Sequence, residues 1–231
     1  MLTVDHVAAG YQESRVLHNI SLQVERGELV GVLGRNGVGK TTLLKTIIGL
    51  LTSQGGTISI DHFNITKTEP EKRVKKGIGY IPQGREIFST LTVEENLLLG
   101  LEAQNTRKPL LPEEVFQLFP VLLEMLQRKG GDLSGGQQQQ LAFARALVGN
   151  PSVLLLDEPT EGIQPSIVSK IQEVIIQLVK EKDIGIIMVD HNIDFLLENA
   201  DYLYVLDRGT VILEGKPSSI DVNLLKTHLT V

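Results

Sequence analysis

Residues 34–42 have the types and the spacing that bind a phosphate chain. They match the pattern G-x-x-x-x-G-K-T. The glycines allow the backbone to curl so that successive N–H groups point at one anion. The lysine of the pattern can reach the β- and γ-phosphates, and the hydroxyl that follows it can bind Mg²⁺. We therefore predict a phosphate-binding loop, the P-loop, made of Gly34, Arg35, Asn36, Gly37, Val38, Gly39, Lys40, Thr41 and Thr42.

The segments on either side of the P-loop favour this interpretation. Residues 29–33 form an apolar run that predicts a buried strand, and residues 43–50 have the pattern of a helix. A strand, the glycine-rich loop and then a helix is the context in which the motif binds phosphate, because the helix N-terminus adds partial positive charge. A glycine-rich turn that merely precedes a helix is the alternative, and these flanks argue against it.

Two carboxylates follow a second apolar run. Residues 153–156 predict a buried strand that ends at Asp157 and Glu158. In this order after a P-loop, Asp157 suits a second anchor for Mg²⁺, and Glu158 is placed to polarise a water molecule against the γ-phosphate. His191 similarly follows the apolar run 184–189, but a histidine at a strand end is more often structural.

Another candidate anion site lies at the predicted start of a helix over residues 135–148. Ser134 is a favourable N-cap, and Gly135 and Gly136 occupy the first turn. Glycine costs about 1 kcal/mol relative to alanine inside a helix. A plain capped helix does not explain two glycines, whereas two accessible N–H groups at a helix start suit an anion.

The rest of the chain predicts an α/β core with a helical insert. Residues 1–33 and 57–60 have the patterns of strands, residues 53–56 of a turn and residues 105–109 of a polar loop. From residue 85 to about residue 150 the apolar periodicity is helical. A capping box at Thr92–Glu95 predicts a helix from Val93 to about Leu101, and Pro120 splits or kinks the next helix, which opens with Pro112 at its first position. We predict a core of residues 1–84 and 151–231 and a helical subdomain of residues 85–150.

Composition excludes several classes of protein. The net charge of −6, with no basic stripe, argues against a nucleic-acid partner. The chain has no cysteine, so it depends on neither disulfides nor thiolate metal sites. No apolar run approaches 18 residues and the N-terminus does not have the pattern of a signal peptide, so we expect neither a membrane span nor a leader.

The motifs taken in order resemble the ATP-binding cassette (ABC) family of transport ATPases. They are the P-loop, Gln83 after a strand, Leu-Ser-Gly-Gly-Gln at residues 133–137, Leu-Leu-Leu-Asp-Glu at residues 154–158, and His191. The resemblance covers essentially the whole chain, and the stretch 133–137 is its most specific part. It implies a RecA-like P-loop NTPase core with an N-terminal antiparallel β subdomain, and an inserted α-helical subdomain that carries the signature stretch 133–137.

The resemblance also implies a role for individual residues. Tyr11 stacks on adenine, Lys40 and the P-loop amides hold the phosphates of ATP, and Thr41 with Asp157 holds Mg²⁺. Gln83 contacts Mg²⁺ or the attacking water and reports the nucleotide state to a membrane partner. Glu158 is the general base, and His191 contacts the γ-phosphate. Residues of the signature stretch close over the nucleotide of a second subunit in a head-to-tail dimer, namely Ser134, Gly135, Gly136 and Gln137.

Within the family, the segments 81–88, 92–97, 137–140 and 158–165 are similar to importers of urea, amides and branched-chain amino acids. This branch implies two different ATPases, two integral membrane permeases and an external solute-binding protein, with the ATPases peripheral to the cytoplasmic face of the inner membrane. One feature departs from the family pattern. Gln164 stands near the place where the family usually has an aspartate, although the importer branch shares this feature.

Three other functions remain to be weighed. A soluble ABC ATPase that acts on nucleic acid or the ribosome is the main alternative, but a single acidic cassette fits it poorly. A GTPase-type switch lacks its Asn-Lys-x-Asp element in this sequence. A regulatory subunit that does not hydrolyse ATP is expected to lack the general base, whereas Glu158 is present.

Overall fold

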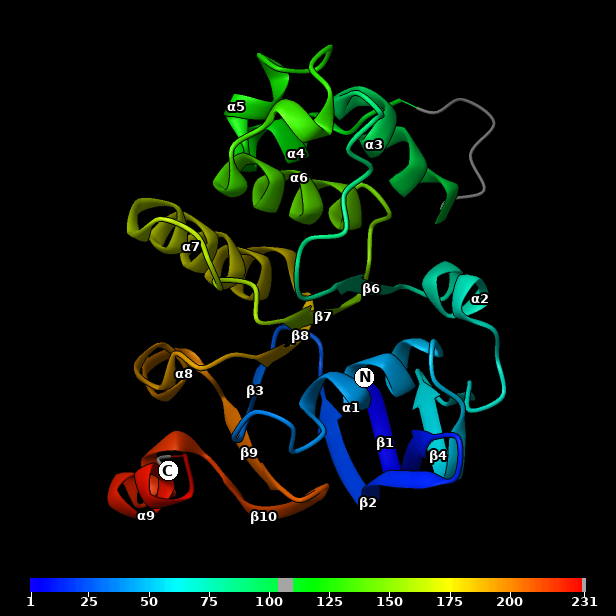
Figure 1. Ribbon diagram of the computed structural model, residues 1–231, viewed down its shortest axis with the longest axis vertical. Helices are drawn as coiled ribbons and strands as arrows, with labels where there is room; N and C mark the ends of the chain where they lie inside the picture. The colour runs from blue at the N-terminus through cyan, green and yellow to red at the C-terminus, as the bar shows by residue number, and fades with distance from the viewer. Residues whose placement is uncertain (104–109, 230–231) are drawn as a thin grey trace.

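The computed structural model describes residues 1–103 and 110–229, so the predicted polar loop 105–109 lies outside the described residues. Figure 1 shows helices stacked above a central sheet and a second sheet below it. The central sheet is made of β3 (Leu29–Leu33), β6 (Ile78–Ile81), β7 (Val153–Asp157), β8 (Gly185–Val189), β9 (Tyr202–Asp207) and β10 (Thr210–Gly215). The second sheet is made of β1 (Leu2–Tyr11), β2 (Ser14–Val24), β4 (Ser53–Ile60) and β5 (Phe63–Asn64).

The central sheet has the strand order β10-β9-β3-β8-β7-β6. All neighbouring pairs in it are parallel except β9 with β10. Every residue of β3, β7 and β8 is buried. Strands buried on both faces read as continuous apolar runs, which is why the sequence marks these three so clearly.

Alternate residues of these strands enter two separate hydrophobic cores. Leu154 and Leu156 face a core shared with the helices above the sheet. Val153 and Leu155 face a core shared with the second sheet and the helix that follows the P-loop. Side chains on a strand alternate between its two faces, so one short run of apolar residues packs both layers of the molecule together.

The second sheet is antiparallel and has the order β2-β1-β4-β5. The predicted turn at residues 53–56 is wrong, because these residues belong to β4, where Ser53 pairs with Ala9 and Gly55 with Ala8. The two adjacent glycines suggested a turn. Instead, Gly56 has a φ of 76° and lies so close to the backbone of Asp5 and His6 that a side chain has no room.

Two helices border the lower core and the edge of the central sheet. The helix α1 (Lys40–Ile48) follows the P-loop, and α2 (Pro70–Lys75), which the sequence analysis did not predict, leads into β6. Figure 1 shows α1 below the central sheet and the remaining larger helices above it. Those are α3 (Val93–Gly100), α4 (Glu113–Leu118), α5 (Pro120–Leu123), α6 (Gly135–Leu147) and α7 (Pro165–Lys182). The last part of the chain forms α8 (Ile193–Asn199) and α9 (Val222–Leu229), and short 3-10 turns occupy Leu101–Ala103, Gly130–Asp132 and Pro217–Ser219.

Several predicted helix ends are confirmed. Thr92 and Glu95 form the capping box at the start of α3, and Pro120 begins α5 after a break at Phe119. Pro112 is the N-cap of α4 rather than its first helical residue, a shift of one position. None of the helices in the described ranges is long and apolar enough to cross a bilayer.

A buried arginine binds the C-terminal end of α1, the helix that follows the P-loop. Arg73 is only 2% exposed, and its guanidinium donates to the carbonyls of Thr46 (2.9 Å) and Ile47 (2.7 Å) at the C-terminus of α1. It also donates to the carbonyls of Thr66 and Thr68. The last carbonyls of a helix have no intrahelical donor, so Arg73 supplies one, although the carbonyl of Thr46 also accepts from the N–H of Gly49 at 3.2 Å.

We expect Arg73→Ala to lower the free energy of unfolding by about 3 kcal/mol, because it leaves several buried carbonyls without a donor. Urea unfolding followed by circular dichroism measures the change. Lys72→Ala is the matched control, since Lys72 is the exposed neighbour on the same helix. Equal stability of the two variants would mean that water satisfies the carbonyls instead.

Candidate functional site

The predicted site residues gather where parallel strands of the central sheet end. The P-loop follows β3, Gln83 follows β6, Asp157 ends β7, and His191 follows β8. Carboxyl ends of parallel strands share one edge of a sheet, and ligands bind there in open α/β folds. A cavity of about 260 Å³ lies at this edge. It is lined by Asn36, Gly37, Gly39, Lys40, Thr41, Thr42, Gln83, Glu158 and Glu161.

Lys40 is held by the P-loop itself. Its Nζ donates to the carbonyl oxygens of Gly34 (2.7 Å) and Arg35 (2.9 Å), and the residue is 5% exposed. Burial lowers the pKa of Lys40, while the nearby carboxylates of Glu158 and Asp157 raise it. An ammonium group that is desolvated and bound only by neutral carbonyls favours an incoming anion, so the site suits phosphate oxygens.

The hydroxyl of Thr41 and the carboxylate of Asp157 come together from different elements. Thr41 Oγ1 donates to Asp157 Oδ1 at 3.1 Å, and Tyr80 Oη donates to Asp157 Oδ2 at 3.3 Å. Asp157 is 1% exposed, and burial raises its pKa despite these two hydrogen bonds. A buried carboxylate beside a hydroxyl oxygen fits a hard divalent cation, which would restore the charged form. Tyr80 was not predicted as a site residue, because only its register opposite Leu155 of β7 places it beside Asp157.

Glu158 lies between His191 and Gln83. Its Oε1 is 2.9 Å from His191 Nε2, and its Oε2 accepts a hydrogen bond from Gln83 Nε2 at 3.1 Å. Burial raises the pKa of Glu158, His191 lowers it, and Glu161 raises it. Glu158 has a φ of 50°, a left-handed conformation that non-glycine residues adopt at a cost and often at functional sites.

Hydrogen bonds hold Asp190 and Asn192, the residues on either side of His191. Thr160 Oγ1 donates to Asp190 Oδ2 (2.9 Å), and the N–H of Asn192 donates to Asp190 Oδ1 (2.8 Å). Sequence reasoning missed Asp190 and Thr160. The pair of polar residues directly after the apolar run 184–189 is the signal that points to Asp190.

Four predicted nucleotide-binding residues outside the signature stretch do not line this cavity, namely Tyr11, Gly34, Arg35 and Val38. Arg35 Nε donates to the carbonyl of His228 at 3.0 Å and its Nη2 to that of Thr227 at 3.3 Å, so its side chain reaches the C-terminal end of α9. Tyr11 ends β1 beside the turn to β2 and is 47% exposed. An aromatic ring this accessible is available for stacking, and its role remains a proposal.

The signature stretch lies elsewhere on the chain. Ser134 and Gln137 form a reciprocal capping box at the start of α6, and none of residues 134–137 lines the cavity. Gly135 and Gly136 have a packing reason besides anion binding. An added Cβ at Gly135 would lie 3.1 Å from the guanidinium of Arg85, and one at Gly136 would lie 2.8 Å from the side chain of Ile167. Gln164 is the N-cap of α7 and makes no capping hydrogen bond with its side chain.

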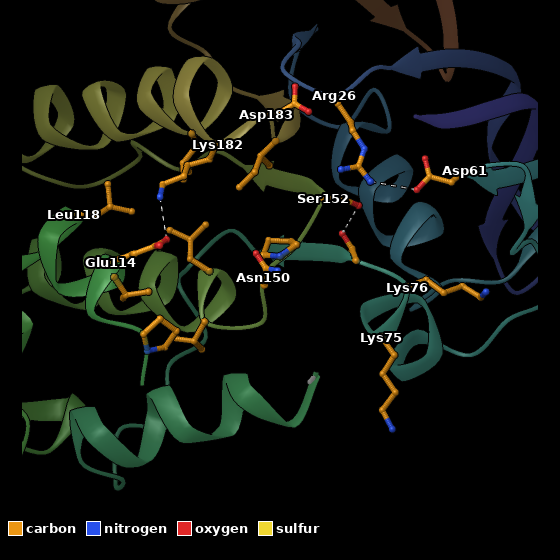
Figure 2. Close-up of a pocket in the computed structure, with 18 residues that line it drawn as sticks. Arg26, Asp61, Lys75, Lys76, Glu114, Leu118, Asn150, Ser152, Lys182 and Asp183 are labelled. Carbon is orange, nitrogen blue, oxygen red and sulfur yellow. Dashed lines mark hydrogen bonds and ion pairs between the residues drawn. The ribbon is translucent and has the colours of Figure 1, made fainter. Parts of the chain in front are cut away.

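A second cavity, of about 660 Å³, lies at the opposite edge of the sheet, where β6, β7 and β8 begin. Figure 2 shows two ion pairs in its wall, Lys182 with Glu114 at 2.9 Å and Arg26 with Asp61 at 3.6 Å. Its lining includes none of the predicted site residues. It is therefore separate from the site at the carboxyl edge.

Comparisons with known proteins find ATP-binding proteins of transporters, which agrees with a phosphate site at this sheet edge. The profile of the family described as "ABC transporter" matches residues 17–161. BraG of Pseudomonas aeruginosa, a high-affinity branched-chain amino acid transport ATP-binding protein, is 37% identical over 96% of this chain and 96% of its own length. LptB of Haemophilus influenzae, a lipopolysaccharide export ATP-binding protein, is 36% identical over 95% of this chain and 92% of its own. A dimeric ATP-binding cassette bound to ADP and Pi has a TM-score of 0.83 and 27% identity, covering 95% of this chain and 100% of its own.

We expect Lys40→Ala to abolish detectable binding of ATP and its hydrolysis, because it removes the only P-loop ammonium that faces the cavity in the described residues. Lys45→Ala on the same helix, which does not line the cavity, is the control. Isothermal titration with ATP measures binding, and phosphate release measures turnover. Unchanged binding in Lys40→Ala would show that the phosphate site lies elsewhere.

Proposed function

The chain belongs to the ABC transporter family as one of its ATP-hydrolysing subunits, and from this premise we propose that it drives a bacterial importer of branched-chain amino acids, amides or urea. The convergence of Lys40, Thr41, Asp157 and Glu158 at one sheet edge carries the hydrolytic part of the proposal. The similarity to BraG, and to LivF of Archaeoglobus fulgidus, named as a probable branched-chain amino acid transport ATP-binding protein, supports import.

In the proposed reaction, Lys40 and the P-loop N–H groups bind the phosphates of ATP, while Tyr11 stacks on adenine. Mg²⁺ would be held by Thr41, Asp157 and the amide oxygen of Gln83, and it would neutralise negative charge on the phosphates. The described residues form no group of three or more His, Cys, Asp or Glu that could hold a metal ion. Mg²⁺ in nucleotide sites generally takes its other ligands from phosphate and water.

Glu158 then orients the attacking water and takes its proton. Its contact with His191 leaves the carboxylate facing the same cavity as Lys40. His191 is half exposed, and its ring can turn from Glu158 to a γ-phosphate oxygen once nucleotide is present. Loss of a positioned general base costs roughly 10²- to 10⁴-fold in rate.

A second cassette completes the site in this proposal. Figure 1 shows α6, which carries the signature stretch, on the upper side of the sheet and α1 on the lower side. Ser134, Gly135, Gly136 and Gln137 of one subunit would then close over the phosphates bound by another, head to tail. Dimeric structures of similar cassettes support this arrangement. We further propose that the partner is a different ATPase, and that residues 85–150 form a helical subdomain on the core of residues 1–84 and 151–231.

The permease would dock in an apolar groove of about 490 Å³ between α2, α3 and α6. Leu50, Phe88 and Leu99 line it and are 60%, 51% and 43% exposed. Large apolar side chains that cluster in a groove mark a protein interface. Arg145 also lines the groove, and its Nη1 is buried with no hydrogen-bond partner in the described residues. We infer an amphipathic permease helix with a carboxylate that reaches this guanidinium.

The assembled transporter would have two membrane permeases, two cassettes and an external solute-binding protein, with this chain at the cytoplasmic face of the inner membrane. The similarity to LptB favours a second candidate, a lipopolysaccharide exporter, because its identity and coverage match those of the importer ATPases. A soluble ATPase that acts on nucleic acid or the ribosome is a further alternative.

We expect Glu158→Gln to slow ATP hydrolysis by at least about 10²-fold, because an amide cannot accept the proton of the attacking water. The variant should bind ATP and accumulate as a closed dimer, which size-exclusion chromatography with ATP detects. Glu173→Gln on α7, whose side chain is 71% exposed, is the control. Normal turnover without a dimer would assign the general base to another residue.

We expect Phe88→Ala to lose the membrane subunits in a pull-down of the tagged chain from solubilised host membranes. Truncating a central aromatic contact costs about 2 kcal/mol, or roughly 30-fold in affinity. Phe63→Ala, at a 63% exposed phenylalanine outside the groove, should retain them.

The identities of the co-purifying chains separate the candidate functions. Two polytopic permeases and a second cassette support the importer, lipopolysaccharide-export components support the exporter, and ribosomal proteins or nucleic acid without a membrane chain contradict transport.

A further inference from the structure

Glu161 is a third carboxylate at the nucleotide site, and none of the proposed roles uses it. It lines the cavity together with Lys40, Gln83 and Glu158. It reaches this position because residues 158–161 form a tight turn, in which the N–H of Glu161 donates to the carbonyl of Glu158 at 3.2 Å. The left-handed conformation of Glu158 begins this turn, and that of Gly162, with a φ of 65°, follows it.

The side chain of Glu161 binds the amide of Gln83. Gln83 Nε2 donates to Glu161 Oε2 at 2.9 Å and to Glu158 Oε2 at 3.1 Å, so both N–H groups of one amide are used. Ionised carboxylates only accept hydrogen bonds, and this determines which end of the amide faces them. The nitrogen of Gln83 is directed at the two carboxylates, and its oxygen is not.

The two hydrogen bonds therefore fix how the amide of Gln83 is turned. An amide binds Mg²⁺ through its oxygen, never through its NH₂ group. Any turn of the amide that brings its oxygen to a metal must break these hydrogen bonds. Without Glu161, one N–H of the Gln83 amide would have no carboxylate partner. Glu161 therefore supplies the second of the two hydrogen bonds that restrain the amide.

A second contact joins the same two segments of the chain. Arg85 Nη2 donates to the carbonyl of Gly162 at 3.2 Å. Arg85 lies two residues after Gln83, and Gly162 directly follows Glu161. Residues 84, 85 and 86 all have positive φ, although only Gly84 is a glycine. Side-chain contacts therefore hold a strained segment of backbone against the turn after β7.

We propose that Glu161 is a positioning residue that holds Gln83 with its amide oxygen away from the metal position until Mg²⁺ and ATP bind. The proposal rests on the proposed role of Gln83 as a metal ligand. Glu161 thereby makes metal binding by Gln83 compete with two hydrogen bonds. The same release frees the segment 83–86, whose Glu86 carbonyl accepts a hydrogen bond from Arg145 in the apolar groove (2.8 Å).

The test measures metal affinity in the full chain with a non-hydrolysable ATP analogue, using Mn²⁺ as the probe and the electron paramagnetic resonance signal of free Mn²⁺ as the readout. Glu161→Ala should tighten Mn²⁺ binding by about three- to tenfold, the scale of one exposed hydrogen bond. Glu161→Gln keeps an acceptor oxygen at the same reach, so it should tighten binding less. Weaker binding in Glu161→Ala would overturn the proposal, because it would mean that this carboxylate attracts or ligates the metal.

A double-variant cycle with Gln83→Ala separates this proposal from the function on which it rests. Glu161→Ala should produce no tightening in the Gln83→Ala background, because Glu161 acts through that amide. Tightening that persists there overturns the restraint. If Gln83→Ala alone leaves Mn²⁺ affinity unchanged, the metal role of Gln83 fails as well. If it weakens binding while Glu161→Ala has no effect in the parent chain, only the restraint fails.

The kinetic readout should agree with the binding measurement. Glu161→Ala should lower the free Mg²⁺ concentration that gives half-maximal ATP hydrolysis by the same three- to tenfold, with a smaller effect on kcat. A fall in kcat without a change in the Mg²⁺ requirement would instead place Glu161 in the chemical step and overturn its assignment as a positioning residue.

Discussion

The ammonium of Lys40, buried among backbone carbonyls and facing two carboxylates, is the charge around which the site is arranged. Desolvation makes this ion costly unless an anion or a carbonyl meets it. The carbonyls of Gly34 and Arg35 accept hydrogen bonds from it. The curvature of the P-loop that would cradle phosphates therefore also supplies the oxygen acceptors of its own lysine.

The two carboxylates near Lys40 are also removed from water, and their charged forms are therefore also costly. Asp157 is buried and the side chain of Glu158 is 8% exposed, and burial raises the pKa of each. Hydrogen bonds from Thr41 and Tyr80 partly offset this for Asp157, and His191 does so for Glu158. These partners come from α1, β6 and the segment after β8, so the electrostatics of the site depend on how the whole sheet edge is assembled.

Contacts with the segment 83–86 connect the nucleotide site to the groove proposed for the permease. Gln83 meets the carboxylates at one end of the segment, and the Glu86 carbonyl meets Arg145 at the other. Arg145 lies over the ring of Phe88 at 5.3 Å, inside the groove. A short backbone segment with several left-handed residues thus touches both sites, which gives a change at one of them a direct physical route to the other.

The sequence by itself determined the features that depend on local patterns. Continuous apolar runs marked β3, β7 and β8, and capping residues marked the starts of α3 and α6, because burial on both faces and orphan N–H groups each leave a local signature. The P-loop was likewise readable from spacing alone. Only the tertiary structure decided that Tyr80 reaches Asp157, that Arg35 turns to α9, and that the glycines at residues 55 and 56 lie in a strand. Each of these depends on strand register or close approach between distant segments, and a local pattern does not encode which remote segment of the chain will lie in contact.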